Sequence, residues 1–443
     1  MIKTTKTMIS GLSLAAILAL SGCTANNPST AKVHNEPSLL ETYANIANDN
    51  YKDALNDAKL LQTAIADFAE NPNEDTLANA KAAWLISRES YGLTEAFRLS
   101  NGPIDAEEGW VADTYGALEG QINAWPLDEN MIDYTIDAKG AKTSGNIIDT
   151  KGKFNPGGEE SSSVDVTNIT VDAITALNEN GGEANVATGY HAVEFLLWGQ
   201  DQDYSNFVKD SVTKGALTAG QRPITDFTTD KDAPRRLAYL KASAQKIVND
   251  LTVISDAWKT GDMTNYRAAI LGLNSDSSKN IDSNEALKQI FAGLGVFIKS
   301  ELANERIAVA VLTPSEEDEH SCFSDNTHRD IATNYQGFKN LLMGTYKGVD
   351  YGTAPIDALD ANVKMEILEL IAQIETKIES INAIAQTSRH FDYQIHPTDP
   401  QTKVIVKLKN ELRKLGDKMV EVASANGIKL SVEDVTDAEE TKL

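Results

Sequence analysis

Apolar side chains recur at every third or fourth position over most of this chain, the spacing that places them on one face of an α-helix. A first amphipathic helix is predicted from Pro37 to the break at Asn71-Pro72. A second begins near Asp75 and ends at the Gly102-Pro103-Ile104-Asp105 break. Both helices are long enough to be members of a helical bundle.

The second predicted helix also carries a polar row. Arg88, Tyr91, Glu95 and Arg98 follow one another in steps of three and four, so they are expected on one face with Trp84. Such a row is either a solvent-exposed face with ion pairs or the lining of a polar cleft between packed helices.

The middle of the chain is less regular. Residues 137–165 are rich in Gly, Lys, Ser and Asn, so they are predicted to form an irregular insertion, and residues 199–233 a second one. Between these insertions we predict one helix over Asp172–Asn178 and another over Glu183–Trp198.

The helical pattern returns after residue 234. One predicted helix ends at Trp258, and a second spans about 284–311. A third starts near Asn326, and two more cover residues 359–381 and 404–422. No run of useful length alternates as a strand does, so the fold class is all-α. We predict two helical-bundle domains with irregular insertions, at residues 37–233 and 234–430, followed by an acidic tail at 431–443. A diverged duplication stays open, because periodicity supports two halves but not their common origin.

One stretch places an imidazole and a carboxylate in an otherwise apolar helix. His191, Glu194 and Trp198 are spaced i, i+3 and i+7, so they share one helical face. A neutral imidazole and a carboxylate on one face form half of a site for zinc or iron. The alternative is a hydrogen-bonded pair that satisfies two polar groups on a partly buried helix.

A second window, residues 316–330, holds two histidines, one thiol and six carboxylates. Asp325 and His328 are the metal-ligand candidates there. Residues 316–319 are expected to form a solvated acidic loop. Cys322 is expected to be a small buried residue rather than a ligand.

Further candidates are cationic or aromatic. Arg98 and Arg222 are placed to bind a carboxylate or to neutralise a buried acid, and Asp105 and Asp226 lie near them in the sequence. The tryptophans are read as core residues or as the walls of a ligand site. The sequence contains no serine nucleophile elbow, phosphate-binding glycine loop or paired-cysteine metal knuckle.

The amino terminus predicts export. Residues 1–22 combine Lys3 and Lys6 with a short apolar core, and Leu20-Ser21-Gly22-Cys23 resembles a lipoprotein cleavage box. Cys23 would be lipidated and followed by a tether to residue 36. Thr24 favours the outer membrane of a bacterial envelope, facing the periplasm or the surface.

The net charge limits the expected binding partners, and the cysteine count limits the expected disulfide bonds. From residue 23 onward the formal charge is 38 − 65 = −27, which excludes nucleic acid as a partner because nothing offsets phosphate repulsion. Such a chain attracts cations. Only Cys322 remains once Cys23 is lipidated, so no intrachain disulfide is expected.

Several ordered motifs together resemble the imelysin family, also classed as imelysin-like peptidases. The central motif is Gly189-x-His191-x-x-Glu194 followed by Phe195-Leu196-Leu197-Trp198-Gly199. The others are Tyr91 with Glu95-Ala96-Phe97-Arg98, Gly102-Pro103-Ile104-Asp105, Asn123-Ala124-Trp125-Pro126, Arg222-Pro223 with Thr225-Asp226, and Asp325-Asn326-Thr327-His328-Arg329-Asp330, the last similar to the iron-regulated protein A branch.

The resemblance implies two helical-bundle domains with the G-x-H-x-x-E helix at an interdomain cleft. It also implies an envelope lipoprotein linked to iron supply. The family name derives from an insulin-cleaving metalloprotease, and His191 and Glu194 match the proposed metal ligands. A catalytic zinc normally has three protein ligands, so a third would come from a distant segment.

Our first functional hypothesis is a metal-binding protein of iron uptake, with iron or zinc as the ion and a receptor or transporter as partner. Ligands would be His191 and Glu194, with Asp325 and His328 as further metal candidates, Glu95 or Asp105 as oxygen donors, and Arg98, Arg222 and Arg329 as anion- or cofactor-binding groups. The alternative is a metallopeptidase in which Glu194 helps to hold zinc and Glu95 activates water. A third is a binder of haem or another small ligand.

Overall fold

The computed structural model describes residues 38–137, 139–201, 217–312 and 319–437. Long helices dominate these ranges. The strands in them form two short antiparallel pairs: β1 (Lys153–Phe154) with β2 (Val164–Asp165), and β3 (Thr345–Tyr346) with β4 (Val349–Asp350). The predicted all-α class is therefore confirmed.

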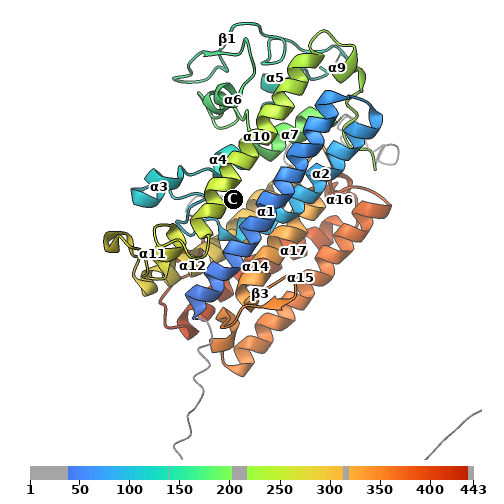
Figure 1. Ribbon diagram of the computed structural model, residues 1–443. Helices are drawn as coiled ribbons and strands as arrows, with labels where there is room; N and C mark the ends of the chain where they lie inside the picture. Colours follow the sequence, from blue (N-terminus) through green and yellow to red (C-terminus); the bar gives the residue numbers. More distant parts are fainter. Residues whose placement is uncertain (1–37, 138, 202–216, 313–318, 438–443) are drawn as a thin grey trace, which may run out of the picture. The chain divides into compact units, whose positions relative to one another are not determined.

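The first group of helices surrounds α1 (Leu39–Glu70), which packs against α2 (Glu74–Gly92) and α10 (Ala233–Trp258). Ser38 and Glu41 form a capping box that satisfies backbone N–H groups at the start of α1. The short α7 (Gly189–Trp198) lies against α2 and α10. Figure 1 shows α1, α2 and α10 side by side.

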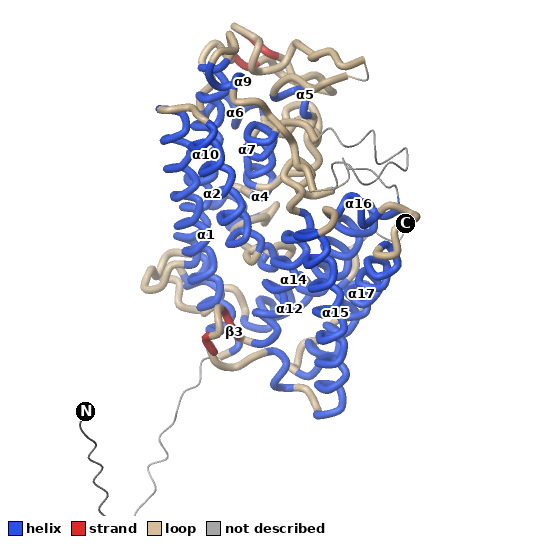
Figure 2. The backbone as a smooth tube through the Cα atoms, turned by 90° about the vertical axis from the view of Figure 1, so that its right-hand side faces the viewer, coloured by secondary structure: helices blue, strands red, loops and turns tan. Residues whose placement is uncertain are grey.

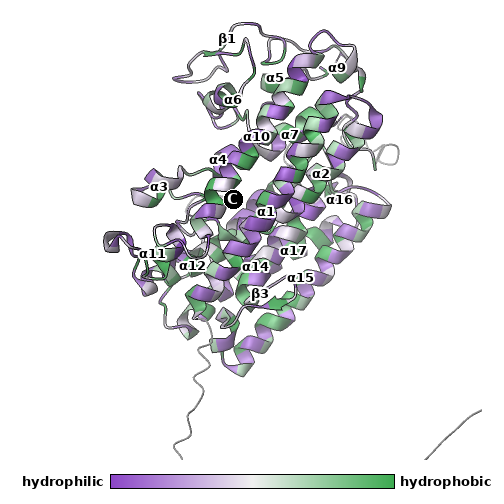
Figure 3. Cartoon of the chain, in the orientation of Figure 1, coloured by the Kyte–Doolittle hydropathy of each residue, from purple (hydrophilic) through white to green (hydrophobic). Residues whose placement is uncertain are grey.

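The second group contains α12 (Ser283–Val296), η3 (Phe297–Ala308), α13 (Val309–Leu312), α14 (Thr327–Met343), α15 (Ala361–Thr387) and α17 (Thr402–Ala425). Helix α17 packs against η3, α12 and α15. Figure 2 shows α12, α14, α15 and α17 together, and Figure 3 shows that the long helices carry both hydrophobic and hydrophilic residues, as amphipathic helices do.

Helices α2 and α14 bring the two groups into contact. The approach is close because of two glycines. A Cβ on Gly92 would lie 2.2 Å from the Thr333 hydroxyl, and one on Gly337 would lie 2.4 Å from the Leu93 carbonyl oxygen. The division into domains near residue 234 stays a prediction. Helix α10, which starts at that point, packs against α1.

Short elements connect the long helices. They are η1 (Glu95–Phe97), α3 (Gly109–Tyr115), α4 (Glu119–Ile122), α5 (Glu129–Ile132), α6 (Val171–Leu177), α9 (Thr225–Thr228), α11 (Tyr266–Ile270), η2 (Ser277–Lys279), η5 (Pro355–Ala358), α16 (Phe391–Ile395) and η6 (Glu433–Val435). Apart from the β1–β2 pair, the described part of the 137–165 insertion has no regular helix or strand, as its composition predicts.

Two helix boundaries differ from the prediction. Helix α2 ends at Gly92, and a single 3₁₀ turn then carries Glu95, so Glu95 and Arg98 do not continue the helical row. Helix α7 begins at Gly189 rather than residue 183. Gly189 has φ +86°, and a Cβ there would lie 2.5 Å from the Ile122 carbonyl oxygen. The glycine therefore permits close approach to the end of α4.

The helix predicted over 284–311 also differs, because its central part is a π-helix. Residues 297–308 of η3 form this wider helix between α12 and α13. A π-helix has hydrogen bonds between residues five apart, and it is often found at functional sites. Its consequence is visible at Glu301 and Arg306, which are five residues apart and yet 2.8 Å from each other.

The predicted leader, Cys23 and the tether lie outside the described residues. No helix within the described ranges combines the length and apolar character needed to cross a bilayer.

Candidate functional site

The centre of the candidate site is a buried pair on α7. Nδ1 of His191 lies 3.0 Å from Oε2 of Glu194, and neither side chain is exposed to solvent. Oε1 of Glu194 accepts hydrogen bonds from the backbone N–H of Ser324 at 3.0 Å and from its hydroxyl at 2.6 Å. Both carboxylate oxygens are thus engaged, and Nε2 of His191 has no hydrogen-bond partner among the described residues.

Burial controls the protonation of this pair. It raises the pKa of Glu194 to about 8, against the lowering effect of the Ser324 hydroxyl. Burial, together with His320 and Arg88, holds the pKa of His191 well below its usual value. Near neutral pH the imidazole is neutral and Glu194 is protonated, so the carboxyl holds a proton that can leave when positive charge arrives nearby.

A second imidazole lies against the first. The rings of His191 and His320 have centroids 4.6 Å apart in an edge-on arrangement, and Trp125 lies 5.0 Å from His191 on centroids. Nδ1 of His320 lies 2.8 Å from Oδ2 of Asp330. Each imidazole therefore has Nδ1 beside a buried carboxylate, but only His191 of the two keeps an Nε2 without a hydrogen-bond partner among the described residues.

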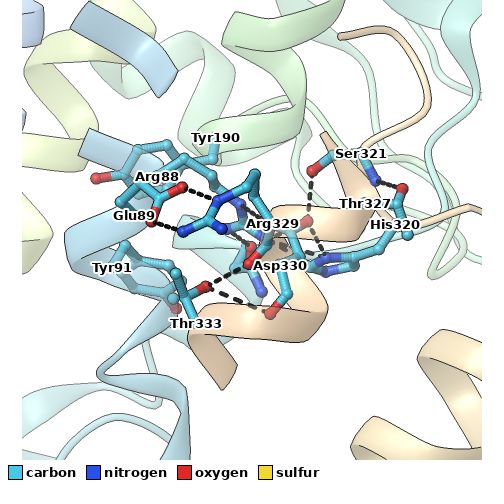
Figure 4. A network of polar contacts seen from close by, with 12 residues as sticks. Arg88, Glu89, Tyr91, Tyr190, His320, Ser321, Thr327, Arg329, Asp330 and Thr333 are labelled. Atoms are coloured by element: carbon cyan, nitrogen blue, oxygen red, sulfur yellow. Dashed lines mark hydrogen bonds and ion pairs between the residues drawn. The ribbon is translucent and has the colours of Figure 1, made fainter. Parts of the chain in front are cut away.

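Arg88 joins this network from α2, as Figure 4 shows. Its Nε donates to Asp330 Oδ1 at 3.0 Å, and its Nη2 lies 3.0 Å from Nδ1 and 3.5 Å from Nε2 of His320. Arg88 also donates to the Asn123 side chain. Burial, Arg306 and Arg88 outweigh the hydrogen bond to Asp330 and lower the pKa of His320 to about 4.

Glu95 is enclosed by three arginines. It lies 2.6 Å from Arg306, 3.6 Å from Arg88 and 3.9 Å from Arg98, and its side chain is fully buried. Asn334 also donates to it at 3.2 Å. The arginines lower the pKa of Glu95 despite its burial. A carboxylate stabilised in this way is a weak base, which disfavours Glu95 as the group that activates water.

The cleft beside this network has a volume of about 660 Å³. Its lining residues are Arg98, Glu119, Asn123, Ala124, Trp125, Pro126, Glu179, Gly182, Glu183, Glu301, Glu305, Arg306, Val309 and His320. His191 lies directly behind two of them, because its ring contacts Trp125 and His320.

The cleft joins residues that are distant in the sequence. Arg98 lies 2.7 Å from Glu301 and 3.4 Å from Glu119. The predicted row therefore contributes to a polar cleft and not to an exposed ion-pair face, although only Arg88 and Tyr91 of its members lie on α2.

The contacts described for Asp325, His328 and Arg329 are with groups other than His191 and Glu194. Asp325 pairs with His390, and Nδ1 of His328 lies 3.1 Å from the Asp325 carbonyl oxygen. Arg329 forms a two-pronged ion pair with Glu89 at 2.6 and 2.8 Å. Ser324, one residue before Asp325, is the member of this run that reaches Glu194.

Arg222 belongs to another buried cluster. It lies 2.6 Å from Asp133 and 3.3 Å from Asp226, and it donates to the Phe195 carbonyl oxygen at 3.2 Å. Asp133 also pairs with Arg236 at 2.7 Å. Arg222 thus neutralises buried acids, which was one of its two predicted roles, and it fixes the end of α7.

Asp105 is a buried carboxyl beside the cleft. Its Oδ2 accepts the Leu99 N–H at 2.6 Å, while Oδ1 is buried with no hydrogen-bond partner among the described residues. Burial raises the pKa of Asp105 to about 6, although Arg98 and the Leu99 N–H act in the opposite direction.

This raised pKa predicts a pH dependence of stability. Between about pH 4 and pH 6 the unfolded chain has an ionised Asp105 while the folded chain keeps it protonated, so stability falls as pH rises. Asp105→Asn removes this contribution. In urea unfolding at pH 4 to 7, the free-energy difference between wild type and variant should change by about 1–3 kcal/mol in favour of the variant. Parallel curves would contradict the assignment.

The donor set fits a metal ion only in part. Within the four described ranges, no group of three or more His, Cys, Asp and Glu side chains is arranged to hold a metal. His191 Nε2 is nevertheless a buried imidazole nitrogen without a partner, and the second imidazole of His320 lies against it. The residues fit a site in which His191 supplies one imidazole ligand, with His320 against it, and water or groups arriving with the ion supply the others. They do not fit a three-ligand catalytic zinc.

Sequence reasoning did not single out His320, Asp330 or Arg306 as site residues, and it named Arg88 only as a member of the polar row. The 316–330 window signalled His320 only as one of several polar groups. Its contact with His191 depends on tertiary packing between segments more than a hundred residues apart, which local spacing does not encode.

Comparison with known proteins gives a family and two similar proteins. The sequence model of the imelysin family matches residues 47–419. Iron-regulated protein A of Synechococcus elongatus is 24% identical over 288 residues, which are 65% of this chain and 58% of that protein. The chain thus spans less than two thirds of the length of this relative.

A solved structure has a related fold. The crystal structure of a protein assigned as an iron-regulated protein A precursor from Parabacteroides distasonis aligns over 87% of this chain and 97% of that one, with a TM-score of 0.54 and 18% sequence identity. At this identity the likeness shows the fold alone.

Proposed function

This chain belongs to the imelysin family, and on that premise we propose that it is a metal-binding protein of iron supply whose cargo site is His191 with His320. The observation that carries the proposal is Nε2 of His191. It is a fully buried imidazole nitrogen without a partner among the described residues, beside a cleft of about 660 Å³. An unsatisfied buried polar atom costs about 1–3 kcal/mol, a cost that a bound metal ion would remove.

Glu194 acts in this proposal as the orienting residue rather than as a ligand. Ser324 occupies its Oε1 and His191 Nδ1 faces its Oε2. Once ionised, the carboxylate at Nδ1 accepts the N–H of the imidazole, which selects the tautomer with a free Nε2 and increases the basicity of the ring. When bound, the metal would supply positive charge at Nε2, and Glu194, with its pKa of about 8, would then release its proton.

Iron is the favoured ion, with zinc as the alternative. Imidazole nitrogen suits both metals. The similarity to proteins named for iron regulation supports iron. We further propose a lipid anchor at Cys23, attachment to the outer membrane, and delivery of the ion to a receptor or transporter. These three proposals rest on the leader-like residues 1–22 and the cleavage-box pattern.

Calorimetric titration with ferrous, ferric, zinc and copper ions tests the function. We expect one ion per chain for the wild type, with proton release that is seen as a dependence of the heat on the buffer. The His191→Ala variant should show neither, while Arg329→Lys, which alters a candidate outside the pair, should bind as the wild type does. Equal and weak binding of all ions by the wild type and the His191→Ala variant would reject the proposal.

A further inference from the structure

The charges of the cleft indicate what kind of cargo can enter it. Five glutamates and two arginines line the cleft, together with His320. Both arginines are already paired. Arg98 lies within 4 Å of Glu95, Glu119 and Glu301, and Arg306 lies within 3 Å of Glu95 and Glu301. Their guanidinium groups are therefore already engaged with carboxylates of the protein, although their Nε atoms are buried without a hydrogen-bond partner among the described residues.

Three lining glutamates remain without an ion pair among the described residues: Glu179, Glu183 and Glu305. All three are exposed, so they lie at the solvent side of the cleft, and we call them the acidic mouth. The pKa of Glu179 is raised mainly by partial burial, and to a smaller extent by the charges of Glu119 and Glu183. The pKa of Glu305 is likewise raised mainly by partial burial, and to a smaller extent by the charges of Glu301 and Asp437. Arg306 acts in the opposite direction on Glu305, but none of the three glutamates has an ion pair among the described residues, so the mouth carries negative charge.

The acidic mouth and the imidazole of His191 are separate features, and both favour a cation as the cargo. Cations are attracted to an acidic rim over about 8–10 Å at physiological salt, and low-dielectric walls strengthen that field. His191, whose Nε2 has no partner among the described residues, contacts the lining residues Trp125 and His320, and an imidazole nitrogen favours a borderline cation. A carboxylate-rich chelate would meet repulsion at the mouth and find no unpaired arginine among the lining residues.

We propose that the cleft takes its cargo as a cation, a hydrated metal ion, and that Glu179, Glu183 and Glu305 set the rate of its capture. The inference rests on the proposed function, and it adds the cargo class and the route of entry. It excludes anionic forms of iron, such as a citrate chelate or a haem with ionised propionates, as the species that enters.

Stopped-flow association with Co²⁺ tests the acidic mouth. Trp125 lies against His191, so quenching of its fluorescence reports arrival of the ion. The variant Glu179→Gln/Glu183→Gln/Glu305→Gln removes three negative charges. The control Asp67→Asn/Glu70→Gln/Glu369→Gln removes three charges from exposed acids that do not line the cleft.

At low ionic strength we expect the association rate constant of the mouth variant to fall about tenfold, with its dissociation rate constant unchanged. The control should stay within about twofold of the wild type, and added salt should reduce the difference. Ferric citrate should give no saturable quenching. Equal association rates for the mouth variant and the control would overturn the inference, as would wild-type binding of ferric citrate that is as tight as that of Co²⁺.

These outcomes are separable from failure of the proposed function. If the wild type binds Co²⁺ at equilibrium and His191→Ala does not, the proposed site stands whatever the mouth variant does. If no metal ion binds the wild type at equilibrium, the proposed function fails, and this inference fails with it.

Discussion

Replacing Glu95 by glutamine is expected to lower the free energy of unfolding by about 3–5 kcal/mol. Glu95 is fully buried, and its carboxylate is the shared partner of Arg88, Arg98 and Arg306. Glutamine has nearly the same shape but no charge, so three buried guanidinium groups would lose one counter-charge. Asp330 and Glu301 would still offset part of this, which keeps the expected loss below that of an isolated buried charge.

Urea unfolding followed by circular dichroism measures this effect. Glu375→Gln is the matched control, because Glu375 pairs with Lys339 at a partly exposed position. That control should cost no more than about 1 kcal/mol. Adding Arg306→Met to Glu95→Gln should recover part of the loss, since it removes one unpaired cation. A loss below about 1 kcal/mol for Glu95→Gln would show that the arginine cluster does not need this carboxylate.

Glu194→Gln is expected to weaken metal binding about 10–100-fold, although Glu194 is not a proposed ligand. Ser324 donates two hydrogen bonds to Oε1, so the amide oxygen of a glutamine would take that position and the amide NH₂ would face His191. An NH₂ group donates to Nδ1 and therefore forces the proton of the neutral imidazole onto Nε2. The nitrogen intended for the metal would then be a donor, and the amide, unlike the protonated carboxyl of Glu194, cannot lose a proton to reverse this.

Titration calorimetry at several pH values distinguishes this mechanism from simple loss of structure. For the wild type, affinity should rise up to about tenfold per pH unit below pH 8, because binding displaces the Glu194 proton. Glu194→Gln should lose this slope along with the affinity. Ser324→Ala keeps the carboxylate and should retain the slope. Unchanged affinity in Glu194→Gln would rule out an orienting role.

Local patterns were sufficient for much of the fold. The apolar spacing of three and four correctly predicted α1, α10, α15 and α17, because each buries one stripe along its whole length. The motifs around Gly189, Asn123 and Asp325 also identified the imelysin family, and the family match over residues 47–419 confirms it.

Local patterns failed where backbone geometry departs from an α-helix. Glu95 and Arg98 lie after the end of α2, since a 3₁₀ turn and a positive φ at Leu99 redirect the chain there. The π-helix η3 places Glu301 and Arg306 on one face at a spacing of five. Neither feature has a periodicity that can be read from a single sequence, because both depend on the partners that the side chains find.

By itself, the sequence determined the all-α class, the family and the pairing of His191 with Glu194, since each depends on residues close together along the chain. Only the tertiary structure decided what that pair can do. It brought the ring of His320, from a distant segment of the chain, to a centroid distance of 4.6 Å from the ring of His191. It also placed Ser324 against Glu194 and surrounded Glu95 with three arginines. These outcomes follow from burial, because a buried polar group costs free energy unless it has a hydrogen-bond partner. Nε2 of His191 is buried and has no such partner among the described residues.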